Sequence, residues 1–192
     1  MGYQKQNVID YVISHGFDVK FVEQPEQFGT GHAVKQAEEY FKDFPCDILI
    51  LCGDVPNLSI KTIRGFIESH ITEKADISVL SVISPNPTGY GRIVRDNKNE
   101  FLKIVEEKDA INMEKQVNEI NSGVYLVKSE LLFSALNKIS NNNAQGEYYL
   151  TDIIAILCSD GALVKAFTGG EFDELLGVNS YEDLKRAEKY FY

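Results

Sequence analysis

The chain has 192 residues, 44% of them hydrophobic, which is enough for one substantial core, so we expect residues 1–192 to form a single domain. It carries 19 basic and 29 acidic residues, a formal net charge of -10, with no Lys/Arg-rich run, which argues against nucleic acid as a partner. No apolar run approaches the roughly 20 residues that span a bilayer, and the N-terminus lacks the apolar core of a signal peptide, so we expect a cytoplasmic protein without a membrane partner.

The three cysteines, Cys46, Cys52 and Cys158, are an odd number and are widely spaced along the chain. None has a His partner at the spacing of a zinc site. This pattern argues against a disulfide framework and against a structural metal, and it predicts buried thiols.

Up to residue 83 the sequence alternates patterns typical of helices with patterns typical of strands. The unbroken apolar run in DILILC predicts a strand that is covered on both faces. The expected elements are a helix at 4–14, a strand at 17–21, a helix after the glycine-rich turn at 28–33, a strand at 47–52, a helix capped by Ser59, and a strand at 75–83. This repetition predicts an α/β fold with a Rossmann-like, mostly parallel sheet built from right-handed crossovers.

The rhythm changes after Pro85, where short strands follow one another. Two of them flank a turn-like segment and a third follows, which predicts a hairpin or meander inserted into the sheet. These strands are expected at 88–96, 100–109 and 119–127. We expect the later elements to be helices at 129–139 and 151–161, a strand at 162–167, and a terminal helix at about 180–192 with Asn179 or Ser180 as its cap.

The chain opens on a helix, whereas a doubly wound nucleotide-binding sheet usually opens on a strand and a glycine-rich loop that receives phosphates. The nearest equivalent is FGTGHAV at 28–34, which has no Lys or Arg in its loop. Its N–H groups and the Thr30 hydroxyl could hold a base or a phosphate, but on this motif alone an ordinary turn before a helix is favoured. We expect His32 to be a capping or packing residue rather than a catalyst.

Asp54 follows the apolar strand, in the segment LCGDVP, and would lie at the carboxyl edge of a parallel sheet, where ligands bind in this architecture. There it could hold Mg²⁺, which prefers oxygen ligands. The alternative, of equal weight, is a turn residue before Pro56. Asn179 also has two interpretations, because it could cap the terminal helix or supply an amide oxygen to the same ion.

Three further positions could meet a ligand. Gly91 in TGYGRIV either brings backbone close to a ligand or forms a tight entry to a strand, and the turn is favoured. Glu106 belongs to a charged strand end that is usually solvated, although an inward carboxylate would suit sugar hydroxyls. The amide of Asn121 could read a hydroxyl or an acetamido group, or could serve a turn. No Ser-His-Asp arrangement, CxxC pair or HExxH motif stands out.

The segment NNNAQGEYYLTD at 141–152 is predicted to be a loop in which Thr151 or Asp152 caps the following helix. The stretches EQFGTGHAV, LCGDVP, PTGYGRIVR, IVEEKDA, EINSGVY, NNNAQGEYYLTDII and GVNS occur in this order. In order and wording they resemble the uridyltransferase domain of the bacterial bifunctional N-acetylglucosamine-1-phosphate uridyltransferase/glucosamine-1-phosphate acetyltransferase family. The resemblance covers nearly the whole chain, and NNNAQGEYYLTD with PTGYGRI is specific to this family.

The resemblance implies a fold of the nucleotide-diphospho-sugar transferase type and a set of site residues. The nucleotide-binding residues that it implies are Gln24, Gly29, Thr30, Cys52, Gly53 and Asp54. The sugar-side residues that it implies are Gly91, Glu106, Asn121 and Asn179, with Glu147, Tyr149 and Thr151 as more distant contacts. Asp54 and Asn179 are the implied Mg²⁺ ligands. Cys52 stands where the family often has an aromatic residue, which affects a packing or backbone contact.

The implied reaction joins UTP to N-acetylglucosamine 1-phosphate and gives UDP-N-acetylglucosamine and pyrophosphate, a step of cell-wall precursor synthesis with Mg²⁺ as cofactor. The family motif resembling LAAGxGTRMxSxxPKxLH, with its phosphate-binding glycines, Arg and catalytic Lys, has no counterpart in this chain. We therefore expect no retained catalytic residue, a missing first βαβ portion, and severe loss of activity in this chain alone. The acetyltransferase repeats, through which the family forms oligomers, are expected to be absent as well.

Two other functions stay open beside this one. The chain could be a non-catalytic remnant that binds UDP-N-acetylglucosamine through Glu106 and Asn121. It could also be a nucleotidyltransferase for another sugar 1-phosphate.

Overall fold

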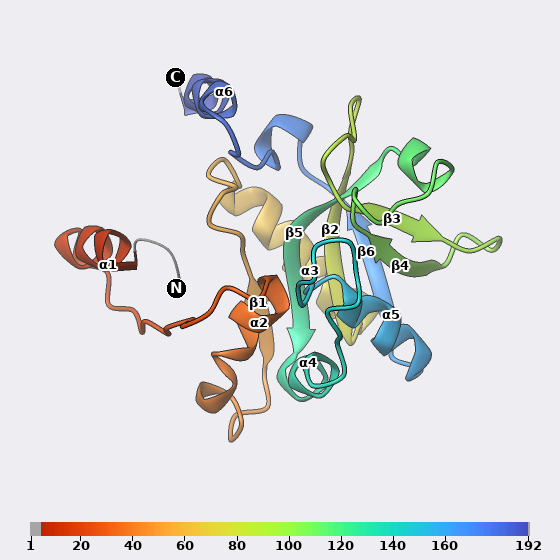
Figure 1. The fold of residues 1–192 in the computed structure, drawn as a ribbon, viewed down its shortest axis with the longest axis horizontal. Coiled ribbons are helices and arrows are strands. Elements are labelled where there is room, and N and C mark those ends of the chain that lie inside the picture. Colours follow the sequence, from red (N-terminus) through yellow and green to blue (C-terminus); the bar gives the residue numbers. More distant parts are fainter. Residues whose placement is uncertain (1–4, 192) are drawn as a thin grey trace.

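The computed structural model describes residues 5–191, and its centre is a six-stranded sheet with helices packed against both faces (Figure 1). The strands are β1 (Asp47–Ile50), β2 (Ile77–Ile83), β3 (Arg92–Arg95), β4 (Phe101–Val105), β5 (Glu119–Lys128) and β6 (Val164–Thr168). Along the sheet the order is β4-β3-β5-β2-β6, and β1 also pairs with β5. One edge of β5 runs against β2, while its other edge is shared by β3 near its start and β1 near its end.

Most helices begin and end close to the predicted places, but α2 ends at Lys35, whereas the spacing of Ala33, Ala37 and Phe41 predicts a longer helix. They are α1 (Lys5–Ser14), α2 (Thr30–Lys35), α3 (Ile60–Glu73), α4 (Ser129–Leu136), α5 (Asp152–Ser159) and α6 (Tyr181–Phe191), with short 3₁₀ turns at Glu38–Tyr40, Glu114–Gln116 and Phe172–Glu174. The predicted cap of α3 is confirmed, since the Ser59 hydroxyl accepts the N–H of Thr62 at 3.1 Å. Ser180 caps α6 in the same way, accepting the N–H of Asp183 at 3.1 Å. Of the two predicted caps of α5, Thr151 or Asp152, Thr151 takes the N-cap position, but its side chain makes no capping hydrogen bond.

Most of the sheet is antiparallel, so the predicted mostly parallel sheet is wrong. β5 runs antiparallel to β1, β2 and β3, and β3 and β4 form an antiparallel pair. Among the described strands, β2 and β6 are the parallel pair. The helix–strand alternation predicts that β1 and β2 are parallel neighbours. Instead, the inserted strand β5 lies between them and pairs antiparallel with both. Alternation along the chain indicates which segments are strands, but not which strand pairs with which.

The sheet separates two hydrophobic clusters, and β2 and β5 contribute to both because alternate residues of a strand face opposite sides. Ile77 and Tyr125 belong to the cluster that includes residues of α4 and α5, whereas Leu80 and Val124 belong to the cluster that includes Phe66 of α3. β2 is buried at every residue except its last. The two long strands therefore form the best-packed part of the molecule.

The N-terminal arm, residues 5–23, lies to one side of the sheet (Figure 1). No residue of α1 is buried, and Tyr11 is 63% exposed. The strand predicted at 17–21 is wrong, since this segment belongs to no ladder. The prediction that β1 is covered on both faces is also wrong: β1 is half-buried at most, and Leu51 just after it is 49% exposed. Among the described strands β1 pairs with β5 alone, so its other edge has no partner there.

The three cysteines are free thiols. The prediction that they are buried is wrong for Cys46, which is exposed, whereas Cys52 and Cys158 are partly buried. The apolar sequence around Cys46 is therefore a poor guide to its burial, because it lies in the loop before β1 rather than in a strand.

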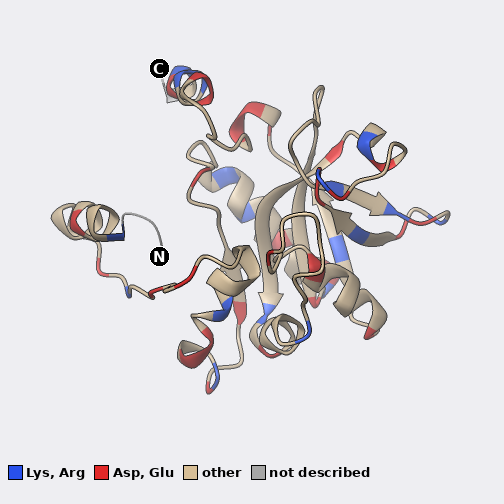
Figure 2. Cartoon of the chain, in the orientation of Figure 1, with Lys and Arg blue, Asp and Glu red and all other residues tan. Residues whose placement is uncertain are grey.

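Charged residues of both signs are interspersed over helices, strands and loops in the view of Figure 2. Acidic residues are in excess, as the net charge requires. Among residues 5–191, no helix combines the length and the apolar character needed to cross a bilayer.

Candidate functional site

Gly91, Glu106 and Asn121 lie far apart in the sequence and come together where β3 begins and β4 ends. The N–H of Asn121 donates to the carbonyl oxygen of Gly91 at 2.9 Å. A Cβ added to Gly91 would lie 3.4 Å from a carboxylate oxygen of Glu106. These three of the four predicted sugar-side residues therefore form one cluster.

A β-bulge in β5 sets the position of Asn121. The register of β5 against β2 shifts just after Leu80, which leaves Ser122 and Gly123 as extra residues on β5. The side-chain nitrogen of Asn121 donates to the Tyr125 hydroxyl at 2.8 Å, and its side-chain oxygen accepts the N–H of Gly123 at 3.0 Å. Both ends of the amide are thus held, and Asn121 serves a strand bulge rather than a turn.

The carboxylate of Glu106 is half-buried and accepts a hydrogen bond from the Thr151 hydroxyl at 3.0 Å. Burial raises the pKa of Glu106, and the hydrogen bond from Thr151 opposes that shift. The nearby carboxylates of Asp152 and Asp109 raise the pKa of Glu106 further. The idea of a solvated strand end is therefore wrong for Glu106, although it holds for Lys108 and Asp109, which are exposed.

Arg92 is a part of this site that sequence reasoning missed. Its side chain is 1% exposed, and a terminal nitrogen lies 2.5 Å from a carboxylate oxygen of Glu107. The same oxygen accepts the N–H of Gly89 at 3.2 Å, so the ion pair ties down the turn that precedes β3. The hydrogen bond from Arg92 lowers the pKa of Glu107. No sequence signal distinguishes Arg92 from Arg95, which ends the same short strand and is only partly buried.

The glycine-rich turn before α2 packs against the segment that leads to α5. The N–H of Gly31 donates to the carbonyl oxygen of Tyr148 at 2.8 Å, and the N–H of Tyr148 donates to that of Phe28 at 2.7 Å. The Thr30 hydroxyl accepts the N–H of Leu150 at 3.0 Å. Two stretches more than 100 residues apart thus form one wall, and Thr30 already has a structural role there.

Gly29 and Gln24 complete this wall. Gly29 has a φ of +111°, and a Cβ there would lie 2.7 Å from the carbonyl oxygen of Tyr148 and 2.9 Å from the Cβ of Glu147, so only glycine fits. The buried side chain of Gln24 donates to the carbonyl oxygen of Gly29 at 3.1 Å, and its amide nitrogen lies 3.1 Å from Nδ1 of His32. His32 is thus hydrogen-bonded to Gln24, in line with the predicted packing role.

Cys52 packs against the bulge of β5. Its thiol donates to the carbonyl oxygen of Gly123 at 3.4 Å. Burial raises the pKa of the Cys52 thiol to about 11, with a smaller contribution from the Asp54 carboxylate, so the thiol stays protonated and is a poor nucleophile. The exposed Gly53 links it to Asp54, so this loop is fixed at one end to the strand that carries Asn121.

Asp54 and Asn179 meet beside Gly177. A Cβ added to Gly177 would lie 3.3 Å from Nδ2 of Asn179 and 3.4 Å from Oδ2 of Asp54. The N–H of Val178 donates to the carbonyl oxygen of Asp54 at 2.7 Å, which holds the two loops together. A carboxylate and an amide are groups whose oxygens a hard cation accepts. The described residues contain no group of three or more His, Cys, Asp or Glu that could hold a metal ion by themselves.

The three more distant predicted contacts lie along one segment but face different neighbours. Thr151 bonds to Glu106, and Glu147 borders Gly29. Tyr149 is buried, and burial raises its pKa. The segment at 147–151 therefore joins the wall around Gly29 to the cluster around Glu106. The Cys52–Gly123 contact joins that cluster to the loop of Asp54.

Solved structures share this arrangement of the sheet and define its class. The chain superposes on a UDP-glucose pyrophosphorylase complexed with UDP-glucose with a TM-score of 0.71 at 16% identity, covering 99% of this chain and 78% of that one. It superposes on HddC from Yersinia pseudotuberculosis with a TM-score of 0.68 at 22% identity, covering 100% and 76%. At these identities the likeness concerns the fold, and it confirms the predicted nucleotide-diphospho-sugar transferase fold.

The chain belongs to the nucleotidyl transferase family, which it matches over residues 3–183. It is 50% identical over 166 residues to the bifunctional protein GlmU of Clostridioides difficile (strain 630), covering 86% of this chain and 36% of that protein. It is 49% identical over 176 residues to the bifunctional protein GlmU of Caldanaerobacter subterraneus subsp. tengcongensis, covering 91% and 38%. The chain thus spans little more than a third of these relatives, and the predicted resemblance to the uridyltransferase domain of such bifunctional proteins is confirmed.

Proposed function

We propose that this chain recognises the sugar, the base and the metal ion in the transfer of UMP from UTP to N-acetylglucosamine 1-phosphate, which yields UDP-N-acetylglucosamine and pyrophosphate. The observation that carries this proposal is the cluster of Gly91, Glu106 and Asn121, oriented by Thr151 and Tyr125. These groups suit a ligand that has both hydroxyl and acetamido groups. The similarity to bifunctional proteins named GlmU supports the same substrates.

On the sugar side, Glu106 and Asn121 have separate roles. The carboxylate of Glu106 accepts hydrogen bonds from sugar hydroxyls, and its bond to Thr151 keeps it in place before the sugar arrives. The amide of Asn121, held by its bonds to Tyr125 and Gly123, presents a fixed edge to the acetamido group. Preorganised polar groups of this kind lower the entropy cost of binding.

On the base side, the hydrogen bonds of Gln24 decide which of its atoms meets uracil. Its amide nitrogen is used by the carbonyl oxygen of Gly29 and by His32. The side-chain oxygen is therefore the group that we assign to the N3–H of uracil. Backbone groups of Gly29 and Thr30, at the turn before α2, would complete the polar edge, and Cys52 with Gly53 would border the nucleotide from the other loop.

Asp54 and Asn179 are the residues that would hold a magnesium ion. The donor set fits, because a carboxylate and an amide lie side by side at Gly177 in an exposed position that phosphates can reach. When bound, Mg²⁺ supplies positive charge beside the phosphates. An oxygen of the sugar phosphate attacks the α-phosphorus of UTP in line as pyrophosphate leaves, and the residues of this chain contribute by orienting the two reactants.

Calorimetric titration with UDP-N-acetylglucosamine in the presence of Mg²⁺ tests this proposal. Removing the amide in Asn121→Ala is expected to weaken binding about 10-fold to 100-fold, the effect of one or two lost hydrogen bonds from a preorganised group. Asn118→Ala is the matched control, since Asn118 is an exposed asparagine just before the same strand. Equal affinities of the unchanged chain and the Asn121→Ala variant would sink the proposal.

The same sample separates the two other functions. Mg²⁺-dependent release of pyrophosphate from UTP and N-acetylglucosamine 1-phosphate identifies a transferase, whereas binding of UDP-N-acetylglucosamine without release identifies a non-catalytic binding protein. Stronger competition by another hexose 1-phosphate would indicate a different sugar. The cytoplasmic location predicted from the sequence belongs to this proposal as well.

A further inference from the structure

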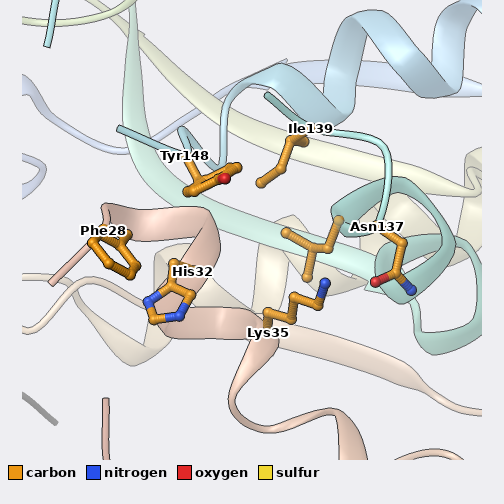
Figure 3. Close-up of a pocket in the computed structure, with 7 residues that line it drawn as sticks. Phe28, His32, Lys35, Asn137, Ile139 and Tyr148 are labelled. Atoms are coloured by element: carbon orange, nitrogen blue, oxygen red, sulfur yellow. The ribbon is translucent and has the colours of Figure 1, made fainter. Parts of the chain in front are cut away.

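A cavity lies outside the cluster of site residues, between α2 and the C-terminal end of α4. Its volume is about 410 Å³, within the range of small-molecule pockets. The residues that line it are Phe28, His32, Lys35, Leu136, Asn137, Ile139 and Tyr148 (Figure 3). None of them is among the residues assigned above to the nucleotide, the sugar or the metal ion.

Two basic side chains, Lys35 and His32, line this pocket, and none of the lining residues is acidic. Lys35 is half-buried and has no acidic partner among the described residues. In Figure 3 its side chain extends along the pocket between His32 and Asn137. Because Gln24 donates to Nδ1 of His32, the neutral ring carries its hydrogen on Nε2 and is a donor as well. An unpaired, half-buried ammonium group on a chain of net charge -10 is a site for an anion.

The other side of the pocket is apolar and aromatic, and it is preformed. Tyr148 and Ile139 lie opposite Phe28 and Lys35 in Figure 3. The Tyr148 backbone is fixed by two hydrogen bonds to the turn before α2, and a Cβ added to Gly31 would lie 2.6 Å from Cδ1 of Ile139, so the walls are in close contact beneath the cavity. The Phe28 and His32 rings are 5.2 Å apart between centroids. Their planes are tilted by 60°, so a flat ligand that lies against one ring presents its edge to the other.

We propose that this pocket binds a small planar anion, an aromatic ring that carries a carboxylate or a phosphate. The ring lies against Phe28 and Tyr148, and the anionic group takes hydrogen bonds from Lys35 and His32. No residue that lines the pocket is assigned to the nucleotide, the sugar or the metal ion, so this proposal does not depend on the proposed transferase reaction. Aromatic carboxylates and nucleoside monophosphates share this chemistry and are two sources of such a ligand.

The test is a titration of the isotope-labelled chain, followed by NMR, with two matched pairs of probes. The carboxylate arm compares naphthoate with neutral naphthamide, and the phosphate arm compares AMP with adenosine. We expect at least one anion to shift the amide signals around His32 and Ile139, and its neutral counterpart to bind about tenfold more weakly or not at all. The arm that responds identifies the source.

The variant Lys35→Met removes the ammonium group and keeps the alkyl stem, so it is expected to weaken binding of the anion by about tenfold and to leave the neutral probe unaffected. Lys98→Met, in the exposed turn between β3 and β4, is the control and should bind as the unchanged chain does. If Lys35→Met unfolds, the comparison of charged and neutral probes on the unchanged chain still tests whether the pocket prefers an anion. Absence of binding by both anions, equal binding of the neutral probes, or full affinity in a folded Lys35→Met variant would overturn the proposal.

Discussion

At the scale of single residues, the end of β4 holds two adjacent carboxylates in opposite electrostatic situations. Burial raises the pKa of Glu106, whereas the buried guanidinium of Arg92 lowers the pKa of Glu107. Glu106 is thus partly shielded from water, and Glu107 stabilises the fold by pairing with a charge that would otherwise be buried alone. Removing one partner of such a pair usually costs more than the pair contributes, because the remaining charge has no compensation.

The two carboxylates should therefore shift stability with pH in opposite directions. The native pKa of Glu106 lies above its ordinary value of 4.5, so the stability associated with Glu106 is fully present below that value and is lost as the pH rises through the native pKa. Glu106→Gln keeps an acceptor for Thr151 and removes this loss. In urea titrations, we expect the free energy of unfolding of Glu106→Gln minus that of the unchanged chain to increase as the pH rises from about 4 to about 8.

Glu107→Gln supplies the comparison of opposite sign. The native pKa of Glu107 lies below 4.5, so the stability associated with Glu107 is present above that value and is lost as the pH falls through the native pKa. This variant is expected to be destabilised at about pH 8 and to approach the unchanged chain at low pH. Glu100→Gln, in the exposed turn before β4, is the neutral control. A common sign for the two adjacent variants would contradict the assigned environments.

The residue types in the sequence predicted part of this site but gave no indication of Arg92. The amide of Asn121 and the carboxylate of Glu106 were predicted from the hydrogen bonds that a sugar needs, and the structure brings both into one cluster. Arg92 could not be predicted, because burial of a guanidinium depends on a partner 15 residues away whose position is set by the β3–β4 pairing. Whether these residues bind a sugar stays a prediction.

At the scale of elements, the bulge in β5 is the feature that shapes the site. Gly123 has a φ of +80°, and a Cβ there would lie 2.5 Å from the sulfur of Cys52. The glycine therefore serves two needs at once, a left-handed backbone and close contact with the loop that leads to Asp54. Without the bulge the Asn121 amide would lose its bond to the N–H of residue 123.

Gly123→Ala is expected to destabilise the chain by about 2 kcal/mol or more, from backbone strain and from the clash with the Cys52 sulfur. Adding Cys52→Ala removes the sulfur and should restore part of this loss, leaving about 1 kcal/mol for the left-handed backbone. Urea denaturation of the single and double variants measures both terms.

Gly65→Ala is the control for this experiment. Gly65 lies within α3 with open space around it, so the added methyl group should be neutral or stabilising by about 0.5–1 kcal/mol. A double variant that is no more stable than Gly123→Ala would show that the sulfur contact is unimportant.

Helix positions and two of their caps followed from local sequence, because a helix satisfies its own hydrogen bonds and a cap such as Ser59 acts within one turn. Strands depend on partners. The alternating residues at 17–21 predict a strand, yet no neighbouring edge pairs with them in the described fold. Thr151 shows the same limit at a helix end: its hydroxyl is a good cap by type but is used by Glu106.

At the scale of the whole molecule, the α/β class and the element order could be predicted, whereas the direction of the sheet could not. The decisive feature is the position of β5 between β1 and β2. Its pairing with β1 joins segments more than 70 residues apart, which no local pattern encodes. The likeness to solved nucleotide-sugar enzymes confirms the class. The predicted organisation as a single domain and the predicted loss of activity stay predictions.

The pairing of β5 along both edges also predicts the order in which backbone amides exchange with solvent. Because β5 is bonded on both sides and β2 is buried along nearly its whole length, their amide hydrogens should exchange with solvent only when the whole sheet opens. Amides of α1, which buries no residue, should exchange fastest. Exchange measured by mass spectrometry on the native chain checks this order, and slower exchange in α1 than in β5 would refute it. Asn121 lies in β5, which is expected to exchange most slowly, while Asp54 and Asn179 lie on exposed loops. A sugar would therefore meet a half-site that persists for as long as the fold does, whereas the loops that would hold the metal ion lie outside the sheet and are joined by the bond from Val178 to Asp54.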